Sequence, residues 1–356
     1  MLFYILLLTI AVVNCFFPVK IQKITTPILF CVLMLLCGLR GHDVGRDTVN
    51  YVFFAENPGA FNLAWGPIYS FFISVSQSTS DPATTFLFIM AVFTYIPLMI
   101  ISRTVSSFPA LTVLMYMIPN GLFFYESFNL ARQILAISYI LVAVVYLSQN
   151  KIIISLLFAI LGFFLHPYTI FFVPFYFVNN IRFSQGSVYI LIIFSAFLGV
   201  FGVLDYITDV LGIMTSTFED SSFAMFTKFA KYGEVGSEIE SHYSMIGALS
   251  HILPLSLICI LGAKNASRED VYYKMMVIGA VVTNLFVGII YCERIASTFT
   301  IAQILAIPLM FKTAKPTDRI KYISVVALTA MLYIYNLYQQ SQDINVWTPY
   351  HTIFSK

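Results

Sequence analysis

The chain has 356 residues, of which 59% are hydrophobic and only 10% are charged, and its mean hydropathy is +0.87. This composition lies far outside the range of soluble domains, so a soluble enzyme is excluded and no nucleic-acid partner is expected. The net charge of +2 carries little information in itself. In a membrane protein the positions of the charges are more informative than their sum.

Short polar segments divide the chain into apolar runs, and a membrane-spanning helix needs about 20 apolar residues. The runs are 1–17, 26–39, 66–78, 83–101, 109–125, 130–148, 152–166, 168–181, 187–204, 245–262, 272–291, 295–311 and 319–338. We predict an all-α fold, with residues 1–356 in a single integral membrane domain of about twelve spans. Run 66–78 is too short to cross comfortably, which indicates a re-entrant or interfacial segment. The first run has no basic start and no small-residue cleavage site, so we expect a retained helix rather than a signal peptide.

Basic residues predict the orientation, because cytoplasmic loops collect Lys and Arg. If the N-terminus is outside and run 66–78 does not cross, 12 of the 19 Lys and Arg residues fall on the cytoplasmic side. The same threading places the acidic segment of about 205–244 outside, as a long exoplasmic loop. Its aromatic and carboxylate side chains would suit closure over a glycan, and a packed lid without ligand contacts is the alternative.

Arginines remain on the exoplasmic side, each at a helix end or in a short polar motif: Arg40, Arg46, Arg132 and Arg294. Their position runs against the trend for basic residues to stay inside. The guanidinium fork pairs bidentately with phosphate and carboxylate groups, whereas lysine acts as a point charge. These arginines therefore indicate an anion-binding site on the outer face, and snorkelling to lipid headgroups is the alternative.

Other polar groups converge on the same side of the membrane. The stretch FNLARQ (128–133) places Asn129, Arg132 and Gln133 at i, i+3 and i+4, so we expect them on one face of a helix. Asp47 and His166 are also predicted on this side, with Glu126 just before FNLARQ. Asp47 has a simpler interpretation as a turn residue, and His166 as a satisfied interfacial histidine.

Several motifs occur together in one order: GRDTVNY (45–51), FNLARQ, FxLH (163–166), ERIA (293–296) and PYHTIF (349–354). With them the chain resembles the EpsG/Wzy-like family of bacterial polysaccharide polymerases over essentially its whole length. The resemblance implies a GT-C-like membrane glycosyltransferase of the bacterial inner membrane. Such proteins join undecaprenyl-diphosphate-linked oligosaccharides into O-antigen, capsule or exopolysaccharide chains on the periplasmic side. The family's motif positions correspond to Asp47, Asn129, Arg132, Gln133, His166 and Arg294, but the family often has Gly-Thr-Asp where this chain has Gly-Arg-Asp.

Glycosyl transfer from a lipid diphosphate requires stabilisation of a negatively charged leaving group and a base for the acceptor hydroxyl. No DxD pair stands out, so we assign the diphosphate to arginines and expect neither a metal nor another cofactor. Arg132 and Arg294 are the first candidates, with Arg46 or Arg40 contributing. Asp47 and His166 are the base candidates, with Glu126 behind them, while Asn129 and Gln133 would orient sugar hydroxyls or a neighbouring arginine.

Other functions remain open at this point. An O-antigen ligase would use the same donor with a different acceptor. A flippase or transporter would also be polytopic, but it is expected to carry polar residues near the middle of the bilayer and often shows internal repeats. Besides the lipid-linked oligosaccharides, the expected partners are membrane lipid and, as a further candidate, a chain-length regulator.

Overall fold

The computed structural model describes residues 2–45, 47–60, 66–118, 123, 126–201, 245–265, 269–287, 290–340 and 350–354. In these ranges the regular secondary structure is helical, and one isolated antiparallel bridge joins Arg40 and Thr352. The helices are α1 (Leu2–Asn14), α2 (Val19–Gly38), α3 (Thr48–Glu56), η1 (Pro58–Ala60), α4 (Pro67–Ser76), α5 (Pro82–Thr104), α6 (Pro109–Met117), α7 (Ser127–Asn129), α8 (Ala131–Ser148), α9 (Ile152–Leu165), η5 (Pro167–Phe172), α10 (Phe175–Val178), α11 (Gln185–Val200), α14 (Met245–Gly262), α15 (Val271–Leu285), α16 (Ile290–Thr300), α17 (Gln303–Thr313) and α18 (Pro316–Gln340).

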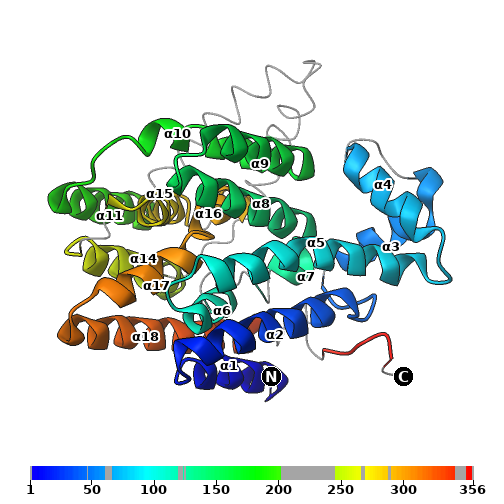
Figure 1. Cartoon of the computed structure of the whole chain (residues 1–356), viewed down its shortest axis with the longest axis horizontal. Coiled ribbons are helices and arrows are strands. Elements are labelled where there is room, and N and C mark those ends of the chain that lie inside the picture. The colour runs from blue at the N-terminus through cyan, green and yellow to red at the C-terminus, as the bar shows by residue number, and fades with distance from the viewer. Residues whose placement is uncertain are drawn as a thin grey trace.

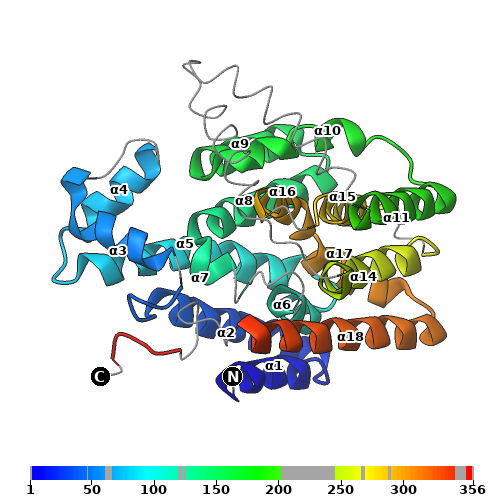
Figure 2. The same cartoon turned by 180° about the vertical axis from the view of Figure 1, so that it is seen from behind.

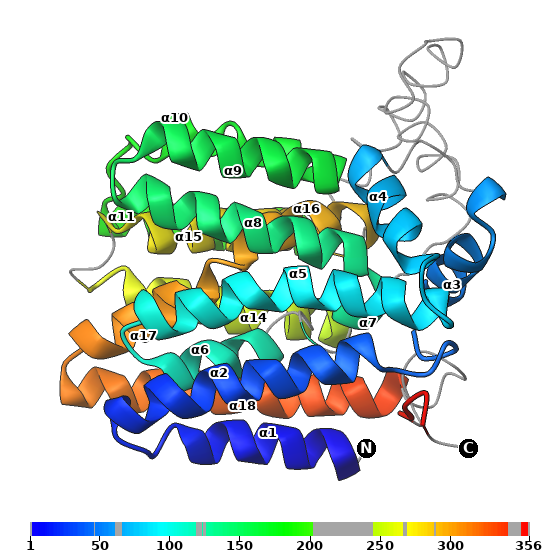
Figure 3. The same ribbon diagram turned by 45° about the vertical axis from the view of Figure 1, so that its right-hand side comes forward.

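The long helices lie side by side in one bundle (Figure 1). In the views from the front and from behind, α1, α2 and α18 form one edge of the bundle, and α9 and α10 form the opposite edge (Figures 1 and 2). The short helices α3, α4 and α7 lie at one end, where both chain termini are also found (Figure 3). We call this the α3 end.

Helix length and composition confirm an all-helical, multi-pass membrane protein. Within the described ranges, Val19–Gly38, Pro82–Thr104, Ala131–Ser148 and Arg294–Thr313 are long and apolar enough to cross a membrane. The last of these combines most of α16 with α17. Further apolar helices have 10–17 residues. The most buried of the long single helices is α8, in which 72% of the residues are buried.

Helix α4, in the anomalous run 66–78, has only 10 residues. At 1.5 Å per residue it is about 15 Å long, half the thickness of a hydrocarbon core. Gly66 precedes it, with a φ of +86° that favours glycine, and the helix begins at Pro67, whose missing N–H costs nothing in a first turn.

A small hydrophobic core, separate from the main one, joins α3 and α4 to the ends of the bundle helices. Its buried members among the described residues are Tyr51, Ala55, Tyr69, Phe72, Ile73, Ala83, Phe86, Leu87, Met90, Ala131, Leu135, Ala136 and Leu165. They come from α3, α4, α5, α8 and α9, so this small core fixes α3 and α4 against the start of α8 and the end of α9.

The prediction of one helix through FNLARQ is wrong, because the helix breaks at Leu130 (φ −109°, ψ 43°) between α7 and α8. In a continuous helix the Phe128 carbonyl would accept from the backbone N–H of Arg132. Instead it accepts from Nη2 of Arg40 at 3.4 Å and from Oγ1 of Thr48 at 3.3 Å. The freed N–H of Arg132 donates to the Tyr51 hydroxyl. Asn129 therefore does not share a helix face with Arg132 and Gln133.

The segment before α3 packs closely on this break. Gly45 has φ +98°, and a Cβ there would lie 2.5 Å from the Phe128 carbonyl oxygen. The C-terminal PYHTIF motif covers the same segment, since the Gly41 N–H donates to the His351 carbonyl at 2.9 Å and Asp43 contacts the His351 ring at 2.7 Å. GRDTVNY, through Gly45, and PYHTIF, through His351, thus both have a structural role at the α3 end.

Candidate active site

Arg132 lies in the first turn of α8 and is half-buried. Its guanidinium carbon stands 5.5 Å from the centroid of the Tyr69 ring, a cation–π distance. The Tyr69 hydroxyl donates to the carbonyl of Leu165 at 3.0 Å. Since Leu165 is the last residue of α9 and His166 follows it, Tyr69 connects Arg132 to the segment that carries the histidine.

Gln133 ties α8 to α16. Its Nε2 donates to the Arg294 carbonyl at 2.9 Å and to the Ser297 hydroxyl at 2.6 Å. Its Oε1 is buried and has no hydrogen-bond partner among the described residues. Gln133 and Arg294 are 161 positions apart in the sequence. This bridge therefore holds the N-terminal halves of α8 and α16, which carry Arg132 and Arg294, next to each other.

Asp47 precedes α3, is half-buried, and makes no side-chain cap to that helix. Tyr51 lies one turn further on. Burial raises the pKa of the Tyr51 hydroxyl, the charge of Arg132 opposes that rise, and the charge of Asp47 adds to it. Both charges therefore act on the same hydroxyl, and Asp47 belongs to the surroundings of Arg132.

His166 forms the junction between α9 and η5. It is buried, with extended backbone (φ −156°, ψ 121°), and its ring lies 5.2 Å from that of Tyr168. Pro167 disfavours helical geometry at the preceding residue, which explains why α9 ends there.

Glu126 precedes α7, Asn129 is its last residue, and both are buried, at 5% and 3% exposure. Helix α7 is held by its first residue, Ser127, whose hydroxyl lies 3.0 Å from the Tyr116 hydroxyl and accepts from the Tyr95 hydroxyl at 3.2 Å. The structure thus places both residues in the interior beside the break at Leu130.

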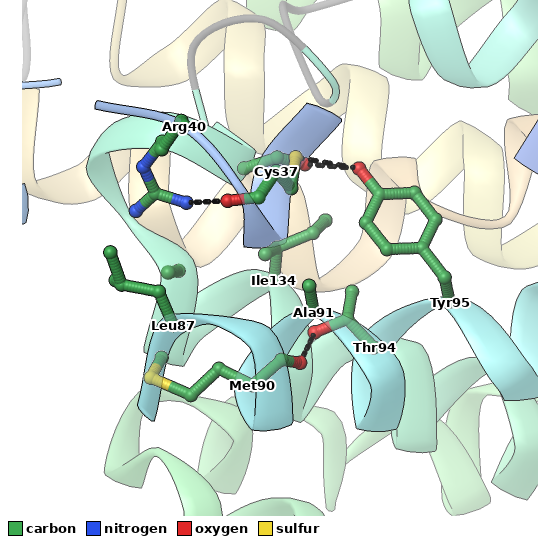
Figure 4. A pocket seen from close by; sticks show the side chains of 10 residues that line it. Cys37, Arg40, Leu87, Met90, Ala91, Thr94, Tyr95 and Ile134 are labelled. Carbon is green, nitrogen blue, oxygen red and sulfur yellow. Dashed lines mark hydrogen bonds between the residues drawn. The ribbon is translucent and has the colours of Figure 1, made fainter. Parts of the chain in front are cut away.

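Arg40 is also buried, at 1% exposure, and each of its nitrogens donates within the protein. Nε donates to Thr48 Oγ1 at 3.1 Å, Nη1 to the Cys37 carbonyl at 2.6 Å and Nη2 to the Phe128 carbonyl at 3.4 Å. Figure 4 shows Arg40 and Cys37 at a cavity of about 10 Å³, the space for a single water. Arg40 therefore supports the segment before α3 from inside.

The model of the EpsG family matches residues 23–352. The chain belongs to the EpsG family. No curated protein and no solved structure matched it. EpsG membership suggests a polysaccharide polymerase with glycosyltransferase-like activity toward lipid-linked oligosaccharides in a membrane.

In this EpsG-family protein the described candidate residues gather at the α3 end. Arg132, Gln133 and Arg294 form the directly linked group, His166 is joined to it through Tyr69, and Asp47 through Tyr51. Arg46 and the loop of about 205–244 lie outside the described residues.

Two tyrosines of the site were missed by reasoning from the sequence. Tyr51 closes the GRDTVNY motif, and that position was a usable signal. For Tyr69 the only signal was its place in the short run 66–78. Tyrosines near helix ends are ordinarily interpreted as part of the interfacial aromatic belt, so the residue type itself did not single it out.

Proposed function

We propose that this EpsG-family protein joins undecaprenyl-diphosphate-linked repeat units into O-antigen, capsule or exopolysaccharide chains at the exoplasmic face of the bacterial inner membrane. The observation that carries the proposal is the Gln133 bridge, which sets Arg132 and Arg294 at the same end of the bundle. Two guanidinium forks from different helices suit a diphosphate, whose oxygens accept bidentate hydrogen bonds.

The membrane arrangement proposed with it has about twelve passes, with α4 resting at the interface. Support comes from the loops at the other end of the bundle. Lys151 lies between α8 and α9, Arg182 between α10 and α11, and Lys315 between α17 and α18. Basic residues collect on the cytoplasmic side, so the α3 end faces outward.

The proposed reaction is a displacement at the anomeric carbon of one repeat unit. A sugar hydroxyl of the other unit attacks that carbon, the bond from carbon to diphosphate breaks, and undecaprenyl diphosphate leaves with the electron pair. Arg132 and Arg294 stabilise the charge that develops on the leaving group. Asp47 or His166 takes the hydroxyl proton. Oε1 of Gln133, which is buried and accepts no hydrogen bond from the described residues, is assigned to a sugar hydroxyl of the bound repeat unit.

Lysine replacements separate a phosphate fork from a general positive charge. We expect Arg132→Lys and Arg294→Lys to insert normally, since lysine preserves charge and snorkelling, yet to leave cells with single repeat units instead of long chains. The measurement is a gel of the lipid-linked and surface glycan beside a blot for the protein.

Arg319→Lys is the matched control. Arg319 lies at the other end of the bundle, over the Phe311 ring at 5.6 Å, and donates to the Lys312 carbonyl. It should give wild-type chain lengths. Wild-type chains in both Arg132→Lys and Arg294→Lys would reduce those residues to membrane anchors.

A further inference from the structure

Tyr69 occupies a position that the proposed chemistry does not yet use. It lies in the first turn of α4 and is fully buried in the small core. Gly66, directly before α4, lies beside α9: a Cβ on Gly66 would be in ordinary van der Waals contact with the Phe164 carbonyl oxygen, at 3.7 Å. Helix α4, too short to cross a membrane, is thus fixed against the end of α9.

The tyrosine makes two contacts through different parts of its side chain. Its ring lies beneath the Arg132 guanidinium at 5.5 Å, and its hydroxyl donates to the Leu165 carbonyl at 3.0 Å. A ring face restricts where a guanidinium can sit without competing for its N–H donors. The hydroxyl fixes the last residue of α9, directly before His166.

We propose that Tyr69 is a positioning residue that couples the two halves of the active site. Its ring holds Arg132 in place for the diphosphate, and its hydroxyl holds the backbone that presents His166. The inference rests on the proposed function, because it takes Arg132 as a diphosphate ligand. It also gives α4 a role, as a support on which the site is assembled.

The two contacts can be removed one at a time. Tyr69→Phe keeps the ring beneath Arg132 and removes the hydrogen bond to Leu165. Tyr69→Leu removes both and leaves an apolar side chain in the small core. The experiment uses the full chain in nanodiscs, with lipid-linked repeat units purified from the source strain lacking this gene. Inhibition by undecaprenyl diphosphate reports binding of the diphosphate, and the pH dependence of kcat reports the base.

We expect Tyr69→Leu to weaken inhibition by undecaprenyl diphosphate by roughly 3- to 30-fold, the range expected for a partly desolvated cation–π pair. Tyr69→Phe should leave inhibition within about twofold, lower kcat by about fivefold, as for the loss of one hydrogen bond, and shift the pH dependence of kcat. Combining Tyr69→Leu with Arg132→Lys should weaken inhibition little beyond Arg132→Lys alone, because contacting residues are not additive.

Phe72→Leu is the matched control. Phe72 lies on the same helix and in the same small core, with its ring 6.0 Å from that of Tyr69. Its loss costs similar apolar packing but removes no contact with Arg132. The inference is overturned if Arg132→Lys weakens inhibition while both Tyr69 variants match Phe72→Leu. Wild-type inhibition in Arg132→Lys would instead overturn the diphosphate assignment itself, and the inference with it.

Discussion

Asp47 and Arg132 both act electrostatically on the Tyr51 hydroxyl, and Tyr69 connects Arg132 to Leu165, the residue before His166. A general base typically contributes about 10²- to 10⁴-fold to a rate. We therefore expect Asp47→Asn or His166→Ala to lower polymer formation by that order at an unchanged protein level. The measurement is the rate of chain growth in membranes of cells carrying each variant. Full activity in both would move the base to Glu126.

Single residues show how far sequence reasoning reaches. Arg132, Gln133 and Arg294 could be selected because arginine on the predicted outer face is unusual and the amide follows directly. Arg40 carried the same signal, yet its nitrogens all donate within the protein. Arg40 can be buried because Thr48 and the Phe128 carbonyl accept hydrogen bonds from its guanidinium. The Phe128 carbonyl is available only because the helix breaks at Leu130, and Phe128 is 88 positions away from Arg40 in the sequence.

At the scale of elements, the length of run 66–78 was enough to single out α4, whereas the break at Leu130 was not predictable. FNLARQ has no Gly or Pro, so local propensity favours a helix through it. The break exists because Arg40 and Thr48 satisfy the Phe128 carbonyl and Tyr51 accepts the freed N–H of Arg132. Those partners come from a different part of the chain, and tertiary contacts override local propensity here.

A substitution at Gly45 can test how closely the segment before α3 packs on the helix break at Leu130. Its positive φ is unfavourable for other residues, and a Cβ would meet the Phe128 carbonyl at 2.5 Å. We expect Gly45→Ala to destabilise the protein by roughly 1–3 kcal/mol. The measurement is the thermal unfolding midpoint of the full chain in detergent. Gly59→Ala is the control, since a Cβ there meets nothing within 4 Å, and equal midpoints for the two variants would contradict the packing described.

At the scale of the whole molecule, the orientation of the bundle can be tested with single cysteines in a background whose own five cysteines are replaced. Asn50, Ser80, Gln149 and Thr317 are exposed positions. We expect cysteines at 50 and 80 to react with an impermeant maleimide in intact cells, and those at 149 and 317 only after permeabilisation.

Positions 50 and 80 flank α4, so their labelling from the same side is what an interfacial α4 requires. Opposite sides would mean that α4 crosses the membrane. Labelling of 50 and 149 from the same side would contradict the outward-facing α3 end.

The central claim is that Arg132 and Arg294 together hold one lipid diphosphate at the α3 end. The most direct measurement is an electron cryomicroscopy structure of the full chain in nanodiscs, with an undecaprenyl-diphosphate-linked repeat unit bound. We expect diphosphate oxygens at about 2.7–2.9 Å from nitrogens of both guanidinium groups, with the sugars near Gln133. A diphosphate bound elsewhere, with both arginines contacting only protein or bulk lipid, would contradict it.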